Sequence, residues 1–459
     1  MSRDDDHDEP FHPLGEEAEE NYRKLLEDGD HDADLGMAMA KDAMRVTKGE
    51  LSETEFYDRY HEDVVSEFGE DDRPMAEEIE AAREESRLES ALSRLGADEE
   101  TRRETMKKMG VGASALGFGA WATSDGGEEA NPSVMQDTED EADGDGVQWG
   151  MALDLETCDG CLSCVVACNA EHNWDAGANW MYIIAYEDGI VDSPDADDFE
   201  STRDFEYLIR PCQHCTDAPC EKVCPTTARH TRDEGGLVLT DYDVCIGCRY
   251  CQVACPYGVN YFSWDDPEVP VEEHDEEMMY DQRGRWVSGH GPKGVMEKCI
   301  FDPARQDGQM GEEMVGRVAC ADACPPGAIQ FGDMNDPESD PQQYLENTAL
   351  ARALEDDPDD DDLQEAIAVI DGDQEPADDE GLTEEDAERL LQGEYGDNES
   401  QFRLLEEYNT NPNVVYIGNE PGPRAEQVEG PVAYEDVGQV DNRENVLEEQ
   451  TVRFGGLGL

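Results

Sequence analysis

The spacing of the cysteines constrains this chain more than any other feature of its sequence. There are fifteen cysteines, and all lie between residues 158 and 324. Two groups follow C-x2-C-x2-C-x3-C: Cys158, Cys161, Cys164 and Cys168, and Cys245, Cys248, Cys251 and Cys255. A third group follows C-x2-C-x4-C-x3-C: Cys212, Cys215, Cys220 and Cys224. The other three are Cys299, which stands alone, and Cys320 and Cys324, which follow C-x3-C. Such regular short spacings indicate metal binding.

The metal that these spacings predict is iron, bound in iron–sulfur clusters. A short C-x2-C-x2-C loop gives three thiolates to one cluster, and the fourth cysteine, which often precedes proline, reaches the other cluster of a pair. Proline follows Cys224, Cys255 and Cys324 here. Zinc needs only two C-x2-C pairs in a tetrahedral site, so a third close cysteine would be superfluous. A disulfide set is disfavoured by the odd count and by spacings tighter than disulfide geometry easily permits.

The net charge of the chain indicates the salt concentration in which it folds. There are 116 acidic and 33 basic residues, with a net charge of −83, whereas ordinary globular proteins nearly balance the two. At low salt such a chain would repel itself and expand, so we expect a halophilic protein in molar salt, where the screening length is about 3 Å. A disordered acidic protein is the alternative, and it fits only the two ends. The acidity also argues against nucleic acid as a partner.

Local patterns predict helices near the N-terminus and strands in the centre. Ser52 and Glu55 form a capping box, and Phe56, Tyr60 and Val64 follow at helical spacing. A second helical run is expected over 74–95. Short β-prone runs alternate with the cysteine motifs at 149–155, 181–186, 206–210, 236–242, 259–264 and 328–333.

Residues 101–123 resemble a twin-arginine export signal. Arg102 and Arg103 precede a Gly-rich apolar stretch and the small-residue sequence Ala120-Trp121-Ala122. Such signals belong at the N-terminus, and this one begins about 100 residues in, so translation would start later, for example at Met75, or the signal would act internally or remain as a relic. The alternative is an amphipathic linker with a chance arginine pair. No run of about 20 apolar residues predicts a transmembrane helix.

The cysteine segments resemble those of the four-cluster ferredoxin-like electron-transfer subunits of molybdopterin oxidoreductases. Members serve DMSO, polysulfide, thiosulfate, tetrathionate and nitrate reductases, formate dehydrogenases and alternative complex III. The resemblance covers about 148–345 and 402–418, and it rests on the segments CDGCLSCVVACNAEHN, PCQHCTDAPCEKVCPTTA, DYDVCIGCRYCQVACPYGVNYF, EKCIFD, ACADACPPGAIQFGDMNDPES and NTNPNVVYIG. It implies an α+β fold of two interleaved bacterial ferredoxin-like halves with β-strand insertions.

The resemblance also implies four ligand sets, in which each motif sends its last cysteine to a neighbouring cluster. Set 1 is Cys158, Cys161, Cys164 and Cys324. Set 2 is Cys212, Cys215, Cys220 and Cys255. Set 3 is Cys245, Cys248, Cys251 and Cys224. Set 4 is Cys299, Cys320 and Cys168, with Asp302 where the family usually has a fourth cysteine. The implied cofactors are three [4Fe-4S] clusters and one [3Fe-4S] or Asp-ligated [4Fe-4S] cluster.

Asp302 leaves three alternatives for set 4. Its carboxylate binds iron, or it faces the vacant corner of a three-iron cluster held by three thiolates, or it points to solvent. A carboxylate matches iron–sulfur chemistry less well than a thiolate, so we favour the three-iron cluster and place the Asp-ligated cluster second. Arg249 and Lys298 are candidates for tuning potential by charge, and His214 for a hydrogen-bond partner. Four aromatic residues are expected either to shield clusters from water or to pack in the core: Tyr250, Tyr257, Tyr261 and Phe262.

Composition and resemblance together divide the chain into six segments. They are an acidic helical module (1–100), the twin-arginine-like segment (101–123), an acidic linker (124–146), the four-cluster ferredoxin-like domain (147–345), an acidic low-complexity insert (346–400) and a partly ordered C-terminal segment (401–459). The run EDDPDDDD in the insert is expected to be loop or disorder.

The function that the resemblance implies is electron relay. The chain would pass electrons between a molybdopterin catalytic subunit and a membrane quinone-reactive subunit, with no catalysis of its own, since no pterin, nucleotide or nucleophile motif is present. It would lie peripherally on the cell membrane, on the extracytoplasmic face after folded export. The alternative is a stand-alone cytoplasmic polyferredoxin.

Overall fold

The computed structural model describes most of the chain outside residues 75–145. The described residues are 10–13, 15–29, 31–74, 146–175, 177–187, 206–274, 279–356, 358–374, 376, 382–396, 400–422 and 425–441. Pro74 aside, they belong to one structural unit. The helix expected over 74–95, the export-signal-like segment 101–123 and the linker 124–146 lie outside them, apart from the end residues Pro74 and Gly146.

The largest sheet joins parts of the chain that lie far apart in sequence. Its strand order is β8-β1-β10-β9, with β1 (Trp149–Asp154), β8 (Ile329–Asp333), β9 (Gln401–Phe402) and β10 (Val414–Ile417). β1 is parallel to β10, with Met151 opposite Val414, and antiparallel to β8. Every residue of β1 is buried, as expected of a central strand with an apolar sequence. The sheet therefore attaches the C-terminal segment to the cysteine-rich region.

Smaller sheets flank the cysteine motifs. β2 (Tyr182–Glu187) lies between β3 (Glu206–Arg210) and β11 (Glu426–Val428). Two antiparallel pairs consist of β4 (Arg229–Thr231) with β5 (Val238–Thr240), and β6 (Tyr261–Phe262) with β7 (Met296–Glu297). Each of the six β-prone runs contains a strand, so that prediction is confirmed.

A short helix lies in or beside each cysteine motif. These helices are α6 (Ser163–His172), α7 (Pro219–Lys222), α8 (Tyr250–Val253), α10 (Pro303–Gln306) and α11 (Ala319–Asp322). Single 3-10 turns are η2 (Val271–Glu273), η3 (Glu312–Met314), η4 (Glu406–Tyr408) and η5 (Tyr434–Val437). In the part of the chain that is described, no helix is long and apolar enough to cross a membrane. The mixed helix and strand content agrees with the α+β class.

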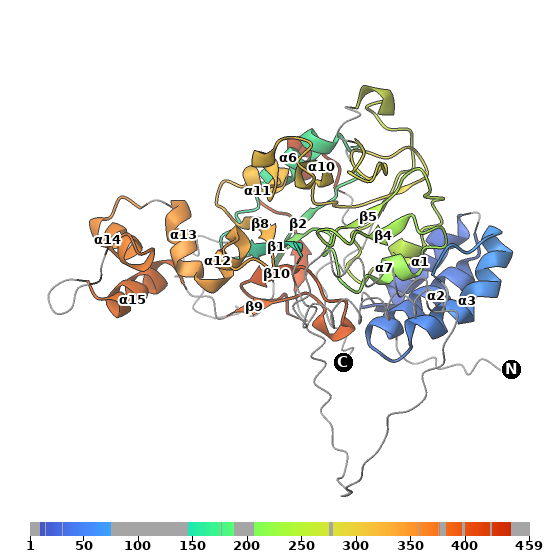
Figure 1. Cartoon of the computed structure of the whole chain (residues 1–459), viewed down its shortest axis with the longest axis horizontal. Helices are drawn as coiled ribbons and strands as arrows, with labels where there is room; N and C mark the ends of the chain where they lie inside the picture. The colour runs from blue at the N-terminus through green and yellow to red at the C-terminus, as the bar shows by residue number, and fades with distance from the viewer. Residues whose placement is uncertain are drawn as a thin grey trace, which may run out of the picture. The chain divides into compact units, whose positions relative to one another are not determined.

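Three N-terminal helices pack together and against the cysteine-rich region. They are α1 (Gly15–Glu27), α2 (Ala33–Thr47) and α3 (Glu53–Phe68). The capping box of Ser52 and Glu55 forms as predicted, and Phe56, Tyr60 and Val64 are buried. α2 contacts both α7 and α8, and Figure 1 shows the blue helices beside the green α7. The helical pattern alone did not indicate this contact.

Polar bonds fix the N-terminal helices on the motifs of sets 2 and 3. His12 Nε2 donates to the carbonyl of Cys255 at 3.1 Å, and the hydroxyl of Tyr250 donates to the carbonyl of Asp32 at 2.6 Å. Lys222 on α7 pairs with Glu53 at 3.1 Å. The N-terminal helices therefore cover the backbone that carries Cys220, Cys224, Cys251 and Cys255.

The acidic insert at 346–400 is helical over much of its described length, and of the run 355–362, where loop or disorder was expected, residues 358–360 are non-helical. After α12 (Asp340–Glu346), the helices α13 (Thr348–Asp356), α14 (Asp361–Ile370) and α15 (Glu384–Tyr395) pack on one another (Figure 1). Their shared core consists of Ala349, Ala353, Ala366, Val369, Ala387 and Leu391. The acidic run misled the prediction because Asp360 is the N-cap of α14 and accepts from the N–H of Leu363. Acidic side chains at a helix N-terminus stabilise it.

Candidate iron–sulfur cluster sites

Two neighbouring cavities are each surrounded by four thiols. One is lined by Cys245, Cys248, Cys251 and Cys224, which are the members of set 3. The other is lined by Cys212, Cys215, Cys220 and Cys255, the members of set 2. Each cavity thus takes three cysteines from one motif and the fourth from the other. This exchange follows from the short helices α7 and α8, which contact each other.

The structure also brings the thiols of set 1 close to one another, and it does the same for the thiols of set 4. Burial, followed by the neighbouring thiols of Cys158, Cys324 and Cys161, raises the pKa of Cys164 well above its ordinary value. Burial, followed by Cys168, Cys299 and Asp302, does the same to the pKa of Cys320. Each group therefore combines residues from motifs that are more than 100 residues apart in sequence.

The thiol-lined cavities fit a metal cluster in their chemistry. All fifteen cysteines lie in described residues and none is in a disulfide. Burial opposes the thiolate form, as the raised pKa values of Cys215 and Cys248 show, and a bound metal deprotonates coordinating thiols. Among the described residues, no three His, Cys, Asp or Glu side chains form a group suited to a single metal ion. The thiols of sets 2 and 3 instead line two cavities in groups of four, as the ligands of an iron–sulfur cluster would.

The loop that begins at Cys299 shares one backbone feature with the complete motifs, although Asp302 itself has a positive φ (48°) that the second cysteines lack. In each motif the second residue after the first cysteine has a positive φ. These residues are Gly160 (69°), His214 (42°), Gly247 (68°) and Phe301 (57°). A positive φ is uncommon for residues other than glycine, so its recurrence at His214 and Phe301 is informative. Asp302 therefore occupies the position that corresponds to the second cysteine of the other loops.

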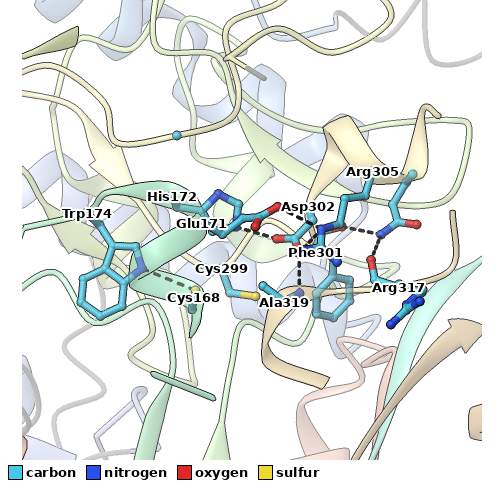
Figure 2. A network of polar contacts seen from close by, with 12 residues as sticks. Cys168, Glu171, His172, Trp174, Cys299, Phe301, Asp302, Arg305, Arg317 and Ala319 are labelled. Carbon is cyan, nitrogen blue, oxygen red and sulfur yellow. Dashed lines mark hydrogen bonds and ion pairs between the residues drawn. The ribbon is translucent and has the colours of Figure 1, made fainter. Parts of the chain in front are cut away.

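Asp302 is buried and both of its carboxylate oxygens have partners. Oδ1 lies 2.6 Å from His172 Nε2, and Oδ2 accepts from the N–H of Ala319 at 2.9 Å. Arg305 Nε is 3.7 Å from Oδ2, and Figure 2 shows these partners surrounding the carboxylate. Burial alone would raise the pKa of Asp302, but His172, the Ala319 N–H and Arg305 lower it below the ordinary value. The alternative that Asp302 points to solvent is excluded, since the residue is 7% exposed.

Two further residues, which the sequence did not single out, contact the residues of set 4: His172 and Trp174. His172 stacks on Trp180 with ring centroids 4.8 Å apart, and Trp174 Nε1 donates to Cys168 Sγ at 3.4 Å (Figure 2). His172 lies one helical turn after Cys168 on α6, so it faces the same side of the helix. That spacing was the available signal for His172. Nothing in the sequence indicated its partner.

Two carboxylates beside set 4 neutralise the positive charge of Arg305. Its guanidinium bonds Glu171 at 2.9 Å and Asp322 at 2.8 Å. Arg305 therefore holds α6, α10 and α11 together, and it contributes little net positive charge to the site.

Other residues proposed from the sequence have defined places. His214 accepts from the N–H of Val238 and donates from Nε2 to the carbonyl of Cys299 at 3.1 Å, so its prediction as a hydrogen-bond partner is confirmed. It stacks on Phe301 with centroids 3.8 Å apart. Lys298 is buried and donates to the carbonyls of Val238 and Cys299. Hydrogen bonds and ring stacking thus hold the loop of set 2 against the loop of set 4.

The aromatic residues near sets 2 and 3 differ in exposure. Tyr250 and Tyr257 are buried, whereas Tyr261 and Phe262 are half-buried. Arg249, which is also buried, lies over the ring of Phe262 at 4.9 Å and over that of Trp264 at 5.0 Å. Trp264 is 50% exposed. The outer side of set 3 is therefore covered by a stacked cation and two aromatic rings.

Comparisons with known proteins bear on both the N-terminal helices and the cysteine motifs. Residues 12–76 match the family model for the N-terminal region of 4Fe-4S ferredoxin iron–sulfur binding proteins, and residues 203–272 match the 4Fe-4S dicluster domain. The first match includes α1 to α3, which contact the motifs of sets 2 and 3.

Three similar proteins illustrate the range of relatives. A putative dimethyl sulfoxide reductase iron–sulfur subunit of Halobacterium salinarum is 38% identical over 43% of this chain and 70% of its own length. The menaquinone reductase iron–sulfur cluster-binding subunit of Nitratidesulfovibrio vulgaris is 37% identical over 46% of this chain and 84% of its own length. An arsenate respiratory reductase iron–sulfur subunit of a Shewanella species is 37% identical, over 43% and 87% respectively.

Proposed function

The chain belongs to the ferredoxin-like iron–sulfur electron-transfer subunits of the molybdopterin oxidoreductase family, and from this premise we propose that it relays electrons between a molybdopterin catalytic subunit and a quinone-reactive subunit in the membrane. The observation that carries the proposal is the pair of adjacent cavities, each lined by four thiols from two motifs. Bound iron–sulfur clusters would supply one-electron redox chemistry at these positions. The chain itself would catalyse no substrate reaction.

The proposed ligands are the four sets. Sets 1, 2 and 3 would each hold a [4Fe-4S] cluster through four thiolates, and set 4 a cluster through Cys299, Cys320 and Cys168. Support comes from the thiol-lined cavities and from the mutual proximity of the cysteines within each set. The domain boundaries given above are proposed with the ligands, with the insert now helical over much of 348–395.

Contacts between the sets suggest their order in space. Sets 2 and 3 exchange Cys224 and Cys255, and sets 1 and 4 exchange Cys168 and Cys324. Cys212 lies close enough to Cys299 to raise the pKa of that thiol, after burial as the main cause, and His214 bonds the Cys299 carbonyl. The order supported is therefore 1–4–2–3. Sets 1 and 3 would be the ends of the relay, where partner subunits exchange electrons with this chain.

For set 4 we favour a three-iron cluster on three thiolates. His172 and the Ala319 N–H engage the two carboxylate oxygens of Asp302, so iron would compete with two existing bonds. Iron–sulfur clusters are held by thiolates, to which a carboxylate is a poor match. An Asp-ligated [4Fe-4S] cluster is the second candidate, and it requires His172 to release Oδ1 or Ala319 to release Oδ2.

Isolation of the native protein tests the proposed function. Anaerobic extraction of membranes at high salt should yield this chain with a molybdenum- or tungsten-containing polypeptide and a membrane subunit. A cluster-loaded chain that is found alone in the soluble fraction would support the cytoplasmic polyferredoxin instead. Protease treatment of intact cells would then test the proposed extracytoplasmic face, since a chain exposed on that face is cleaved.

A further inference from the structure

Arg229 lies between the thiol cavities of sets 2 and 3. It is the first residue of β4 and follows the Cys224-Pro225 turn. Its backbone N–H donates to Cys224 Sγ at 3.3 Å, and its side chain lines the set 3 cavity. Nη2 lies 3.8 Å from Cys251 Sγ. The guanidinium is therefore held against the ligands of set 3.

A second residue fixes the guanidinium toward set 2. Nη2 of Arg229 donates to Asn260 Oδ1 at 2.8 Å, and Asn260 lines the set 2 cavity. Asn260 is anchored in turn, because its Nδ2 donates to the carbonyl of Cys251 at 3.3 Å. Two thiols of set 2, Cys220 and Cys212, are also among the groups that act on the charge of Arg229. One side chain thus faces both sets.

The remaining donors of Arg229 have no protein partner among the described residues. The residue is 1% exposed, and its Nε and Nη1 are buried without a hydrogen bond. The part of the chain that is described places no carboxylate in an ion pair with it, whereas Arg305, Arg352 and Arg232 each pair with Asp or Glu. A buried arginine keeps its proton, and a buried charge without a counter-charge is strongly unfavourable. The negative charge that offsets Arg229 must therefore come from the clusters that the cysteines of sets 2 and 3 would bind.

We propose that Arg229 is a positioning residue for two redox sites, and that its free N–H groups donate to the sulfur atoms of the clusters at sets 2 and 3. This inference rests on the proposed function, because it requires clusters in both sets. Hydrogen bonds to sulfur and the net charge of the surroundings set cluster potentials. Each reduction adds negative charge, so a fixed cation between the two sites favours the reduced form of both. Arg229 therefore raises both potentials.

Redox titration followed by EPR tests this role in the full-length chain, anaerobically loaded with clusters at high salt. In Arg229→Gln, two midpoint potentials should shift to more negative values, and those of sets 1 and 4 should stay unchanged. Cys245→Ser and Cys215→Ser variants assign the signals of sets 3 and 2. Arg229→Lys keeps the charge but loses the forked donors, so we expect a smaller negative shift at the same two sites.

A matched control is available three residues away. Arg232 is also buried, but it pairs with Asp307 at 2.7 Å and donates to the carbonyl of Glu234. Arg232→Gln should leave all potentials unchanged, even if it lowers stability. If Arg229→Gln does not retain its iron, Arg229→Lys decides by the presence or absence of its shift.

Unchanged potentials in both Arg229 variants would overturn the inference, as would an equal shift at all four sites. Either result leaves the proposed function intact, because the clusters are still present. A wild-type chain that binds no iron and sulfide would instead contradict the proposed function itself. The two failures are therefore distinguishable in one set of samples.

Discussion

His172 Nε2 lies 2.6 Å from Asp302 Oδ1, although 130 residues separate the two in sequence. The bond joins α6, which carries Cys168, to the loop that carries Cys299. It places the carboxylate among Cys168, Cys299 and Cys320 and at the same time engages one of its oxygens. The position that corresponds to the second cysteine of the other loops is thus occupied by a carboxylate that is hydrogen-bonded within the protein.

Asp302→Cys should convert set 4 into a four-thiolate site. The new thiol would replace the carboxylate at the same loop position, after a backbone conformation shared with the complete motifs. We expect the near-isotropic EPR signal of an oxidised three-iron cluster to disappear and the iron content to rise by about one atom per chain.

The control for that substitution is Asp302→Asn, which keeps the shape of the side chain but removes its negative charge. It should retain the three-iron signal, because the three thiolates are unaffected. If the wild type lacked the three-iron signal and Asp302→Asn gained it, the carboxylate would be holding a fourth iron and the three-thiolate assignment would be wrong.

Gly36→Ala should detach the N-terminal helices from set 3. A Cβ at Gly36 would lie 2.6 Å from Cε1 of Tyr250 and 2.9 Å from Cδ1 of Leu26, so the ring or the helix must move. Overpacking of this kind costs about 1–3 kcal/mol. Tyr250 precedes the ligand Cys251, and iron release to a chelator, followed by absorbance, should therefore become faster.

Gly393→Ala is the matched control, because no atom lies within 4 Å of its added Cβ. Alanine stabilises the interior of a helix by up to about 1 kcal/mol relative to glycine. Iron release should be unchanged in this variant. Equal rates in Gly36→Ala and the wild type would show that the N-terminal helices do not protect set 3.

Asp42 should make the N-terminal helices sensitive to acid. Burial alone would raise the pKa of Asp42, but bonds from Tyr60, Arg45 and Arg59 lower it below its ordinary value. Because the folded pKa is the lower one, the stabilisation is present above the unfolded pKa of about 4 and is lost as pH falls through the folded value.

Removal of the Asp42 carboxylate tests whether it links the stability of the fold to pH. Asp42→Asn should lower the free energy of unfolding at neutral pH by about 1–3 kcal/mol and flatten its dependence on pH below about 5. Denaturant unfolding monitored by circular dichroism at several pH values measures both effects. If the free energy of unfolding of Asp42→Asn fell with decreasing pH as steeply as that of the wild type, Asp42 would not be a source of the acid sensitivity.

Leu391→Ala should unfold the helical insert without disturbing the cluster sites. Leu391 is 1% exposed in the shared core of α13, α14 and α15, and such truncations cost about 2–5 kcal/mol. Amide hydrogen exchange should lose protection across 348–395 while the EPR signals stay unchanged. Wild-type residues 348–395 that exchange as fast as an unstructured peptide would contradict the helical insert.

The sequence was most informative where chemistry fixes spacing. A cluster needs thiolates at short, regular spacings along the chain, so the cysteine motifs predicted iron–sulfur clusters, and the resemblance to a known family then implied the ligand sets and the special position of Asp302. His172 could not be paired with Asp302, because their contact depends on the packing of α6 against a loop 130 residues away. Arg229 was missed for the same reason, since its neighbours come from several motifs.

Composition was a poor guide outside the cysteine motifs. The run from Glu355 to Asp362 has the composition of a disordered linker, yet it ends one helix and caps the next. The decisive residues there are the few alanines and leucines at helical spacing, which the surrounding acids obscured. For the N-terminal helices the pattern identified a buried face but contained no information on what covers it.

Metal and sulfide analysis combined with EPR tests the central claim most directly. The full-length chain, purified anaerobically at high salt, should contain about fifteen iron atoms and about sixteen acid-labile sulfides, from three four-iron clusters and one three-iron cluster. The mildly oxidised protein should show one near-isotropic signal close to the free-electron position, and stepwise reduction should add the signals of interacting four-iron clusters. Zinc in place of iron, without labile sulfide and without EPR signals in either state, would contradict the account.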